Sequence, residues 1–156
     1  MTNRLKLFAL STAVAAVLAA AGPFSVSAHA VNSEASLVSP TAQANSRAEV
    51  RVNSFFREYR QAVLHKGHST PAQVRARYLA PDLNKRLDAW ALQHDADPVF
   101  RAQNVPASWT TRYEGSGAGH STVVLTERWS GGAKQEVWFS VRLSDLVISD
   151  LKNRPA

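Results

Sequence analysis

STVVLTERWSGGAKQEVWFSVRL, residues 121–143, decides the fold class, because apolar and polar residues alternate along both halves of this stretch. A period of two is typical of β-strands that bury one face. One face of the two halves consists of Val123, Leu125, Glu127, Val137, Phe139 and Val141. The segment Ser130-Gly131-Gly132 between the halves is typical of a tight hairpin, since glycine adopts positive φ without steric cost. We therefore predict paired antiparallel strands at 121–129 and 134–143.

Two further strands are expected beside this hairpin. Residues 109–114 precede the glycine-rich segment 115–119, which we expect to be a loop, and residues 146–151 form the last apolar run. Four consecutive strands joined by short turns predict a meander.

The preceding half of the chain has helical periodicity. The first helix is predicted over 46–65, starting at a capping box formed by Ser46 and Glu49, with one apolar side. That side comprises Val52, Phe55, Phe56, Tyr59 and Val63. A second helix over 70–79 follows the cap Thr70-Pro71-Ala72-Gln73, and a third begins near Pro81 and reaches His94. The predicted fold class is α+β, with three N-terminal helices packed on one face of a curved, four-stranded antiparallel sheet.

The beginning of the chain predicts export. A basic segment with Arg4 and Lys6, an apolar run over 7–21 and the motif Ala28-His29-Ala30 are typical of a cleaved secretory signal peptide over 1–30. The apolar run is shorter than a membrane-spanning helix, so we expect no stable membrane insertion after cleavage. Residues 31–45 are predicted to be a flexible leader, and residues 46–153 a single domain. We expect the protein to be located in the periplasm, with the extracellular medium as the alternative.

Composition narrows the classes of function. The chain has no cysteine, which excludes disulfides, thiol catalysis and thiolate zinc sites. Its net charge of +6 falls to +4 without Arg4 and Lys6, and its basic residues are scattered among acidic ones. Nucleic-acid binders concentrate basic residues on one face, so we expect no nucleic-acid partner. No phosphate-binding or dinucleotide motif occurs, and we predict no cofactor and no metal site.

Several segments resemble the nuclear transport factor two-like superfamily, and within it a group of small exported bacterial proteins of unknown function. The resemblance covers about residues 48–151. It is carried by the aromatic helix 52–59 (VNSFFREY), the joint 78–83 (YLAPDL), and the segments 95–98 (DADP) and 102–106 (AQNVP). It implies a cystatin-like cone built from helices and a curved sheet. It implies no particular chemistry, because enzymes, ligand carriers and interaction modules all share that scaffold.

The long loop 95–108 holds one candidate site, consisting of His94, Asp95, Asp97, Gln103 and Asn104. Carboxylates beside an imidazole are suited to proton transfer, so His94 and Asp97 are the candidate catalytic pair. The alternative is that Asp97 and Gln103 bind the backbone of the loop and hold its shape.

Aromatic side chains form a second candidate site. Tyr59, Trp90, Trp109 and Trp138 are suited to lining a cavity for an apolar ligand. Alternation places Trp138 on the face opposite Val137, where it could join Trp129 in a patch for a partner protein. The alternative is ordinary core packing.

The leading hypothesis is an exported, non-enzymatic binding or interaction module. It uses the cone cavity for a small apolar ligand, or the exposed sheet face for an envelope protein or for a homodimer. One alternative is a small cavity enzyme that uses Asp97 and His94, and another is an antitoxin-like or envelope-assembly partner protein.

Overall fold

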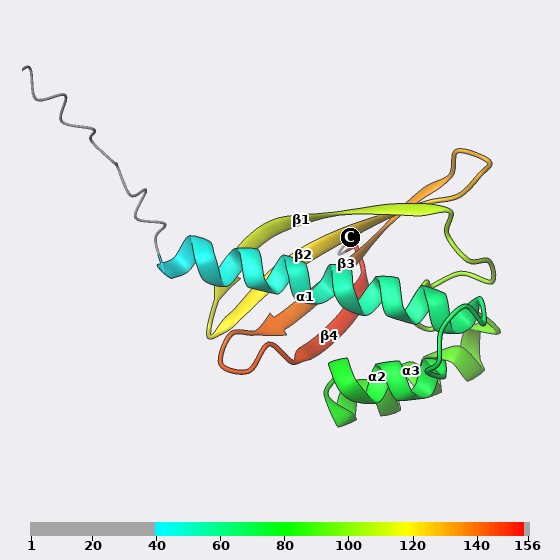
Figure 1. Cartoon of the computed structure of the whole chain (residues 1–156), viewed down its shortest axis with the longest axis horizontal. Helices are drawn as coiled ribbons and strands as arrows, with labels where there is room; N and C mark the ends of the chain where they lie inside the picture. The colour runs from blue at the N-terminus through cyan, green and yellow to red at the C-terminus, as the bar shows by residue number, and fades with distance from the viewer. Residues whose placement is uncertain (1–39, 155–156) are drawn as a thin grey trace, which may run out of the picture. The chain divides into compact units, whose positions relative to one another are not determined.

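A computed structural model describes residues 40–154, which contain a helical half followed by a sheet (Figure 1). The helices are α1 (Pro40–Val63), α2 (Pro71–Tyr78) and α3 (Pro81–His94). The strands are β1 (Ser108–Gly117), β2 (His120–Arg128), β3 (Lys134–Arg142) and β4 (Ile148–Asn153). The predicted signal peptide 1–30 lies outside the described residues.

The sheet is open and antiparallel, with the strand order β1-β2-β3-β4. This confirms the predicted α+β class with a four-stranded meander. The hairpin at residues 130–132 is also confirmed, since Gly132 has a φ of 82° and the Trp129 N–H donates to the Ala133 carbonyl at 3.0 Å.

The first hairpin differs from the prediction. Residues 115–117 belong to β1, and the turn is confined to Ala118 and Gly119, whose φ angles are 48° and 78°. Two residues with positive φ form a tight turn whose twist matches that of the strands, so the glycines before it remain extended. A bulge between Tyr113 and Gly115 shifts the register of β1 against β2.

The first helix begins at Pro40 rather than at Ser46, so the predicted capping box at Ser46 is wrong. Residues 31–39 of the predicted leader lie outside the described residues, whereas residues 40–45 are helical. The early start has a physical reason, because proline is favoured in the first turn of a helix and the Asn45 side chain is fixed to the sheet. Its Oδ1 accepts hydrogen bonds from the hydroxyls of Ser116 (2.9 Å) and Ser121 (3.2 Å).

The second helix starts as predicted. The Thr70 hydroxyl accepts from the Gln73 N–H, while Gln73 Oε1 accepts from the Thr70 N–H. This confirms the capping box at Thr70. Both α2 and α3 carry a proline in their first turn.

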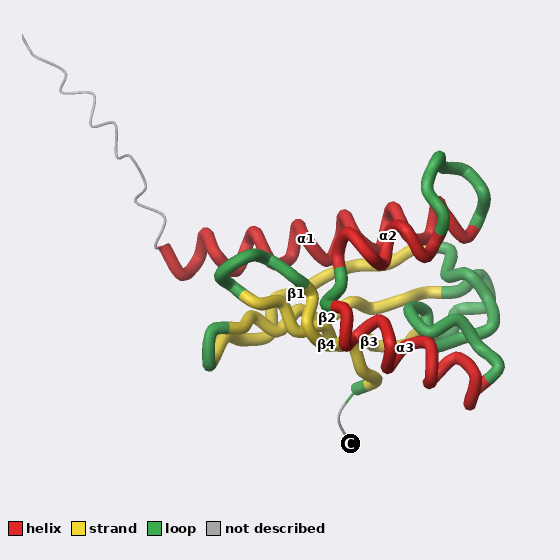
Figure 2. The backbone as a smooth tube through the Cα atoms, turned by 90° about the horizontal axis from the view of Figure 1, so that it is seen from below, coloured by secondary structure: helices red, strands yellow, loops and turns green. Residues whose placement is uncertain are grey.

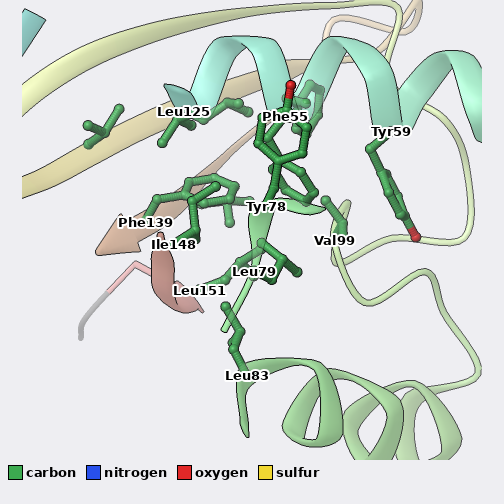
Figure 3. Close-up of a cluster of buried hydrophobic side chains, with 14 of the residues drawn as sticks. Phe55, Tyr59, Tyr78, Leu79, Leu83, Val99, Leu125, Phe139, Ile148 and Leu151 are labelled. Carbon is green, nitrogen blue, oxygen red and sulfur yellow. The ribbon is translucent and has the colours of Figure 1, made fainter. Parts of the chain in front are cut away.

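Helix α1 lies along one face of the sheet and contacts β1, β2 and β3, whereas α2 packs on α1 and α3 contacts β4 (Figure 2). We call the sheet face under α1 the inner face and the opposite one the outer face. The core between α1 and the inner face is filled by side chains that are at most 1% exposed, including Phe55, Phe56, Phe100, Leu125 and Phe139. Figure 3 shows Phe55 among Tyr78, Phe139 and the aliphatic residues of β4.

Candidate functional site

Asp97 is the centre of a partly buried group of hydrogen bonds between α1 and the loop that follows α3. Its Oδ2 accepts a hydrogen bond from the Tyr59 hydroxyl at 2.9 Å. Its Oδ1 accepts from the backbone N–H groups of Val99 (2.8 Å) and Phe100 (2.9 Å). The Asp97 N–H donates to the Ala102 carbonyl at 3.0 Å and closes the loop. Asp97 therefore holds the shape of its own loop, as one of the two predicted interpretations requires.

Tyr59 links this loop to α1. The residue is 3% exposed, and its ring points toward the loop segment near Val99 (Figure 3). Burial raises the pKa of Tyr59 far above its ordinary value, and the negative charge of Asp97 raises that pKa further. The phenol is therefore a permanent donor to Asp97 rather than an acid in a reaction at neutral pH.

Glu127 is a second carboxyl group in this region. Its side chain is fully buried, and neither Oε1 nor Oε2 has a hydrogen-bond partner among residues 40–154. It lies on the inner face of β2, directly between Trp109 of β1 and Gln135 of β3. Burial first, and then the charge of Asp97, raises the pKa of Glu127 to about 9. The group is therefore an uncharged acid at pH 7.

The sequence contained a signal for this residue. Glu127 continues the inner-face alternation of Val123 and Leu125, so its burial follows from the period of the strand. Its closeness to Asp97 did not follow, because Asp97 lies in an irregular loop. The predicted site residues therefore included Asp97 but not Glu127.

The other predicted members of the loop cluster do not converge on Asp97. His94 is exposed, its ring stacks on Trp90 at a centroid distance of 4.1 Å, and its Nδ1 lies 2.8 Å from the Trp90 carbonyl. Gln103 donates to the Asp95 carbonyl at 3.3 Å, and Asn104 is exposed. Among the described residues, no hydrogen bond joins His94 to Asp97. His94 and Asp97 therefore have separate hydrogen-bond partners in this structure.

The loop cluster borders a shallow surface hollow of about 570 Å³ between α3 and the loop. Its walls are formed by Asp88, Ala91, Leu92, Asp95, Ala96, Asp97 and Gln103. It is open to solvent rather than enclosed between helix and sheet. Within residues 40–154, no three histidine, cysteine or carboxylate side chains are grouped so that they could hold a metal ion.

Two of the predicted aromatic residues have structural contacts. Trp109 packs on Phe56 at 5.1 Å between ring centroids and donates to Asn53 Oδ1 at 2.8 Å. The guanidinium of Arg101 lies over the ring of Trp90, 4.2 Å from the ring centroid. With Tyr59 bound to Asp97, these three side chains contribute to packing and do not line an interior cavity together.

Trp138 has a different environment, because it lies on the outer face. Its neighbours across the strands are Val124 on β2 and Lys152 on β4. Val124 is fully buried although it lies outside the main core, while the ring of Trp138 remains half-buried. The indole Nε1 has no hydrogen-bond partner among the described residues. The register places Val124, and not Trp129, opposite Trp138, so the suggested Trp129–Trp138 pair across the hairpin is wrong. Trp129 donates to the Asn104 carbonyl instead.

Polar groups surround Trp138 on this face. A hollow of about 280 Å³ is lined by Thr122, Trp138, Phe139, Ser140, Asp150 and Lys152. Arg86 binds Asp150 at 2.8 Å, whereas Lys152 has no ion pair within residues 40–154. The surroundings of Trp138 therefore combine an apolar surface, hydroxyl groups and a free ammonium group.

The fold defines an α+β domain with an open four-stranded antiparallel sheet. Among solved structures, it is similar to a protein of unknown function from Bacteroides thetaiotaomicron. The TM-score is 0.57 and the sequence identity is 19%, with 74% of this chain and 95% of that chain covered. At this identity the similarity shows the fold alone. No protein-family model and no curated protein matches the chain.

None of the helices described over residues 40–154 is both long enough and apolar enough to cross a membrane.

Proposed function

We propose that this protein is an exported, non-enzymatic interaction module that binds a partner protein of the cell envelope through the outer face of its sheet. The observation that carries the proposal is the contrast at Trp138. A large, half-buried aromatic ring lies on a face that α1 does not cover, while its indole N–H is buried and has no hydrogen-bond partner within residues 40–154. Tryptophan is enriched at protein interfaces because it offers a large apolar area.

The filled interior favours a partner over a small apolar ligand. Phe55 packs on Tyr59, Tyr78 and Phe139, and Phe56 packs on Phe100 and Trp109, with centroid distances between 5.1 and 6.2 Å. A ligand would have to displace these rings, at a cost of roughly 1.5 to 3 kcal/mol for each ring exposed to water. Binding on the outer face displaces only water.

The surroundings of Trp138 indicate the chemistry of the partner. Lys152 supplies a positive charge beside the indole, and Thr122 and Ser140 supply hydroxyl groups. A partner with an apolar anchor flanked by a carboxylate complements this surface. The predicted signal peptide supports the envelope as the compartment where such a partner resides.

We also propose that the domain has the cone-shaped fold of the nuclear transport factor two-like superfamily. The proposal is supported by the helices that precede the sheet and by the packing of α1 across the inner face. The enzyme that uses Asp97 and His94 is the less favoured alternative, because the two side chains have separate partners.

A crosslinking experiment tests the proposed binding face. The mature chain, expressed in its own host with a photo-crosslinking amino acid at Thr126, is expected to capture one stoichiometric envelope protein. W138A and K152E should each reduce the yield at least about tenfold. L92A is the matched control, because Leu92 is 88% exposed on α3, away from the sheet. Equal capture by W138A and the wild type, with both folded by circular dichroism, would overturn the proposal.

A further inference from the structure

The two edges of the sheet differ in how far the rest of the domain covers them. The β4 edge is covered, since Leu79 forms a parallel bridge with Ile148. Three β4 carbonyl groups accept hydrogen bonds: Ile148 O from the Ala80 N–H (2.9 Å), Ser149 O from Arg86 Nη2 (3.3 Å) and Leu151 O from Arg101 Nη2 (2.9 Å). This edge is therefore closed to another strand.

The β1 edge is not covered in this way. Within residues 40–154, no hydrogen bond outside the pairing with β2 involves a backbone atom of Ser108–Gly117. β1 is an edge strand of the sheet, at the opposite edge from β4 (Figure 1). Ten residues of strand offer roughly 33 Å of backbone with unpaired N–H and C=O groups.

Charges near the middle of β1 restrict which strand can pair there. Arg112 and Glu114 contact each other on this strand, and Arg112 also reaches Glu136 at 3.3 Å. These two charges discourage pairing with an arbitrary strand, because like charges opposite each other are destabilising. A strand with the opposite charge order is selected instead.

A second copy of β1 has the required order. When two β1 strands run antiparallel about a twofold axis at Tyr113, Arg112 of each copy lies opposite Glu114 of the other. The same register sets Thr110 opposite Ser116, and both side chains are short and polar. Moving the axis to Arg112 would instead place two arginines opposite each other.

We propose that this protein forms a homodimer through β1, with the twofold axis at Tyr113, so that the two sheets join into one of eight strands. The inference goes beyond the proposed function, because it concerns the edge of the sheet rather than the Trp138 face. An axis perpendicular to the sheet keeps both outer faces on one side. The dimer therefore presents two copies of Trp138 to one partner surface.

The absence of cysteine allows a direct test of this register. A residue on the axis faces its own copy, at a Cα separation of about 4.5 to 5.5 Å, which is within disulfide range. Y113C is therefore expected to form a disulfide-linked dimer under mild oxidation. T110C is the matched control and should not, because its neighbour in the other copy is Ser116. Absence of Y113C crosslinking, or crosslinking of T111C in its place, would overturn the proposed register.

Exchanging the charges of Arg112 and Glu114 tests whether these residues select a second copy of β1 as the pairing strand. The wild type should sediment as a dimer, R112E should weaken dimerisation at least about tenfold, and R112E/E114R should restore it. R142E is the control, since Arg142 binds Asp145 at 2.7 Å and lies on β3. Melting curves must show that all variants are folded. A wild type that remains a monomer at high concentration, or a double variant that stays as weak as R112E, would contradict the proposal.

Discussion

The inner and outer faces of one sheet differ in what their side chains do. On the inner face, Leu125 and Phe139 are at most 1% exposed and pack against the aromatic side of α1. On the outer face, Val124 is buried, but Trp138 beside it keeps part of its ring in solvent. Both faces therefore carry apolar residues, but within residues 40–154 α1 covers only the inner face. Substitutions on the inner face should change stability, and substitutions on the outer face should change binding.

The largest effect is expected at the centre of the inner face. F55D removes a ring that contacts Tyr59, Tyr78 and Phe139 and buries a charge without a partner. The expected loss exceeds about 5 kcal/mol, which is enough to unfold a domain of this size. Far-ultraviolet circular dichroism and urea titration would measure it. A cooperative unfolding transition close to that of the wild type would contradict the assignment of this core.

Asp97 should give the next largest effect, because it connects the loop to α1. D97A removes the acceptor for Tyr59 and for the N–H groups of Val99 and Phe100. We expect a loss of roughly 2 to 4 kcal/mol in the free energy of unfolding, since buried donors lose their partner. D97N keeps one carbonyl oxygen and should lose less. Unchanged stability in both variants, together with the loss of an activity, would favour the enzyme alternative.

Replacement of the Glu127 carboxyl group by an amide should stabilise the domain, and the gain in the free energy of unfolding should depend on pH. Its pKa in the folded protein is about 9, whereas its ordinary value is 4.5. As pH rises from 4.5 to about 9, the unfolded chain releases this proton and the folded chain retains it, so stability falls across that window. E127Q should remove this dependence, and its advantage over the wild type should grow by up to about 1.4 kcal/mol per pH unit.

The measurement for Glu127 is the free energy of unfolding of both proteins at pH 5 and pH 8. E136Q is a suitable control, because Glu136 belongs to the outer face and its ion pairs are partly exposed. A constant difference between E127Q and the wild type at the two pH values would show that Glu127 is solvated.

The smallest effect on stability is expected on the outer face. W138A should lower the free energy of unfolding by about 1 kcal/mol, although it should reduce the crosslinking yield at least about tenfold. Chemical denaturation and the crosslinking yield measure the two quantities on the same sample. A large loss of stability would place Trp138 with the core residues and remove the distinction between the faces.

The regular elements of this fold could be predicted because their signals are local. The period of two in residues 121–143, the cap at Thr70 and the apolar side of α1 depend on neighbours in the sequence. The start of α1 was predicted six residues late, because the contact that fixes Asn45 comes from Ser116 and Ser121, more than 70 residues away. The partners of the candidate site residues could not be predicted for the same reason, since His94 and Asp97 are close in sequence but have different hydrogen-bond partners.

By itself, the sequence determined the alternation that buries Glu127, the open meander and the absence of thiol chemistry, since each depends on residue type and local spacing. The tertiary structure alone decided that Asp97 lies close enough to raise the pKa of Glu127 and that Trp138 lies beside Lys152. It also decided that, within residues 40–154, the β4 edge is covered and the β1 edge is not. These features arise from contacts between distant segments, and the relative position of such segments is set by packing of the whole domain rather than by any periodic pattern.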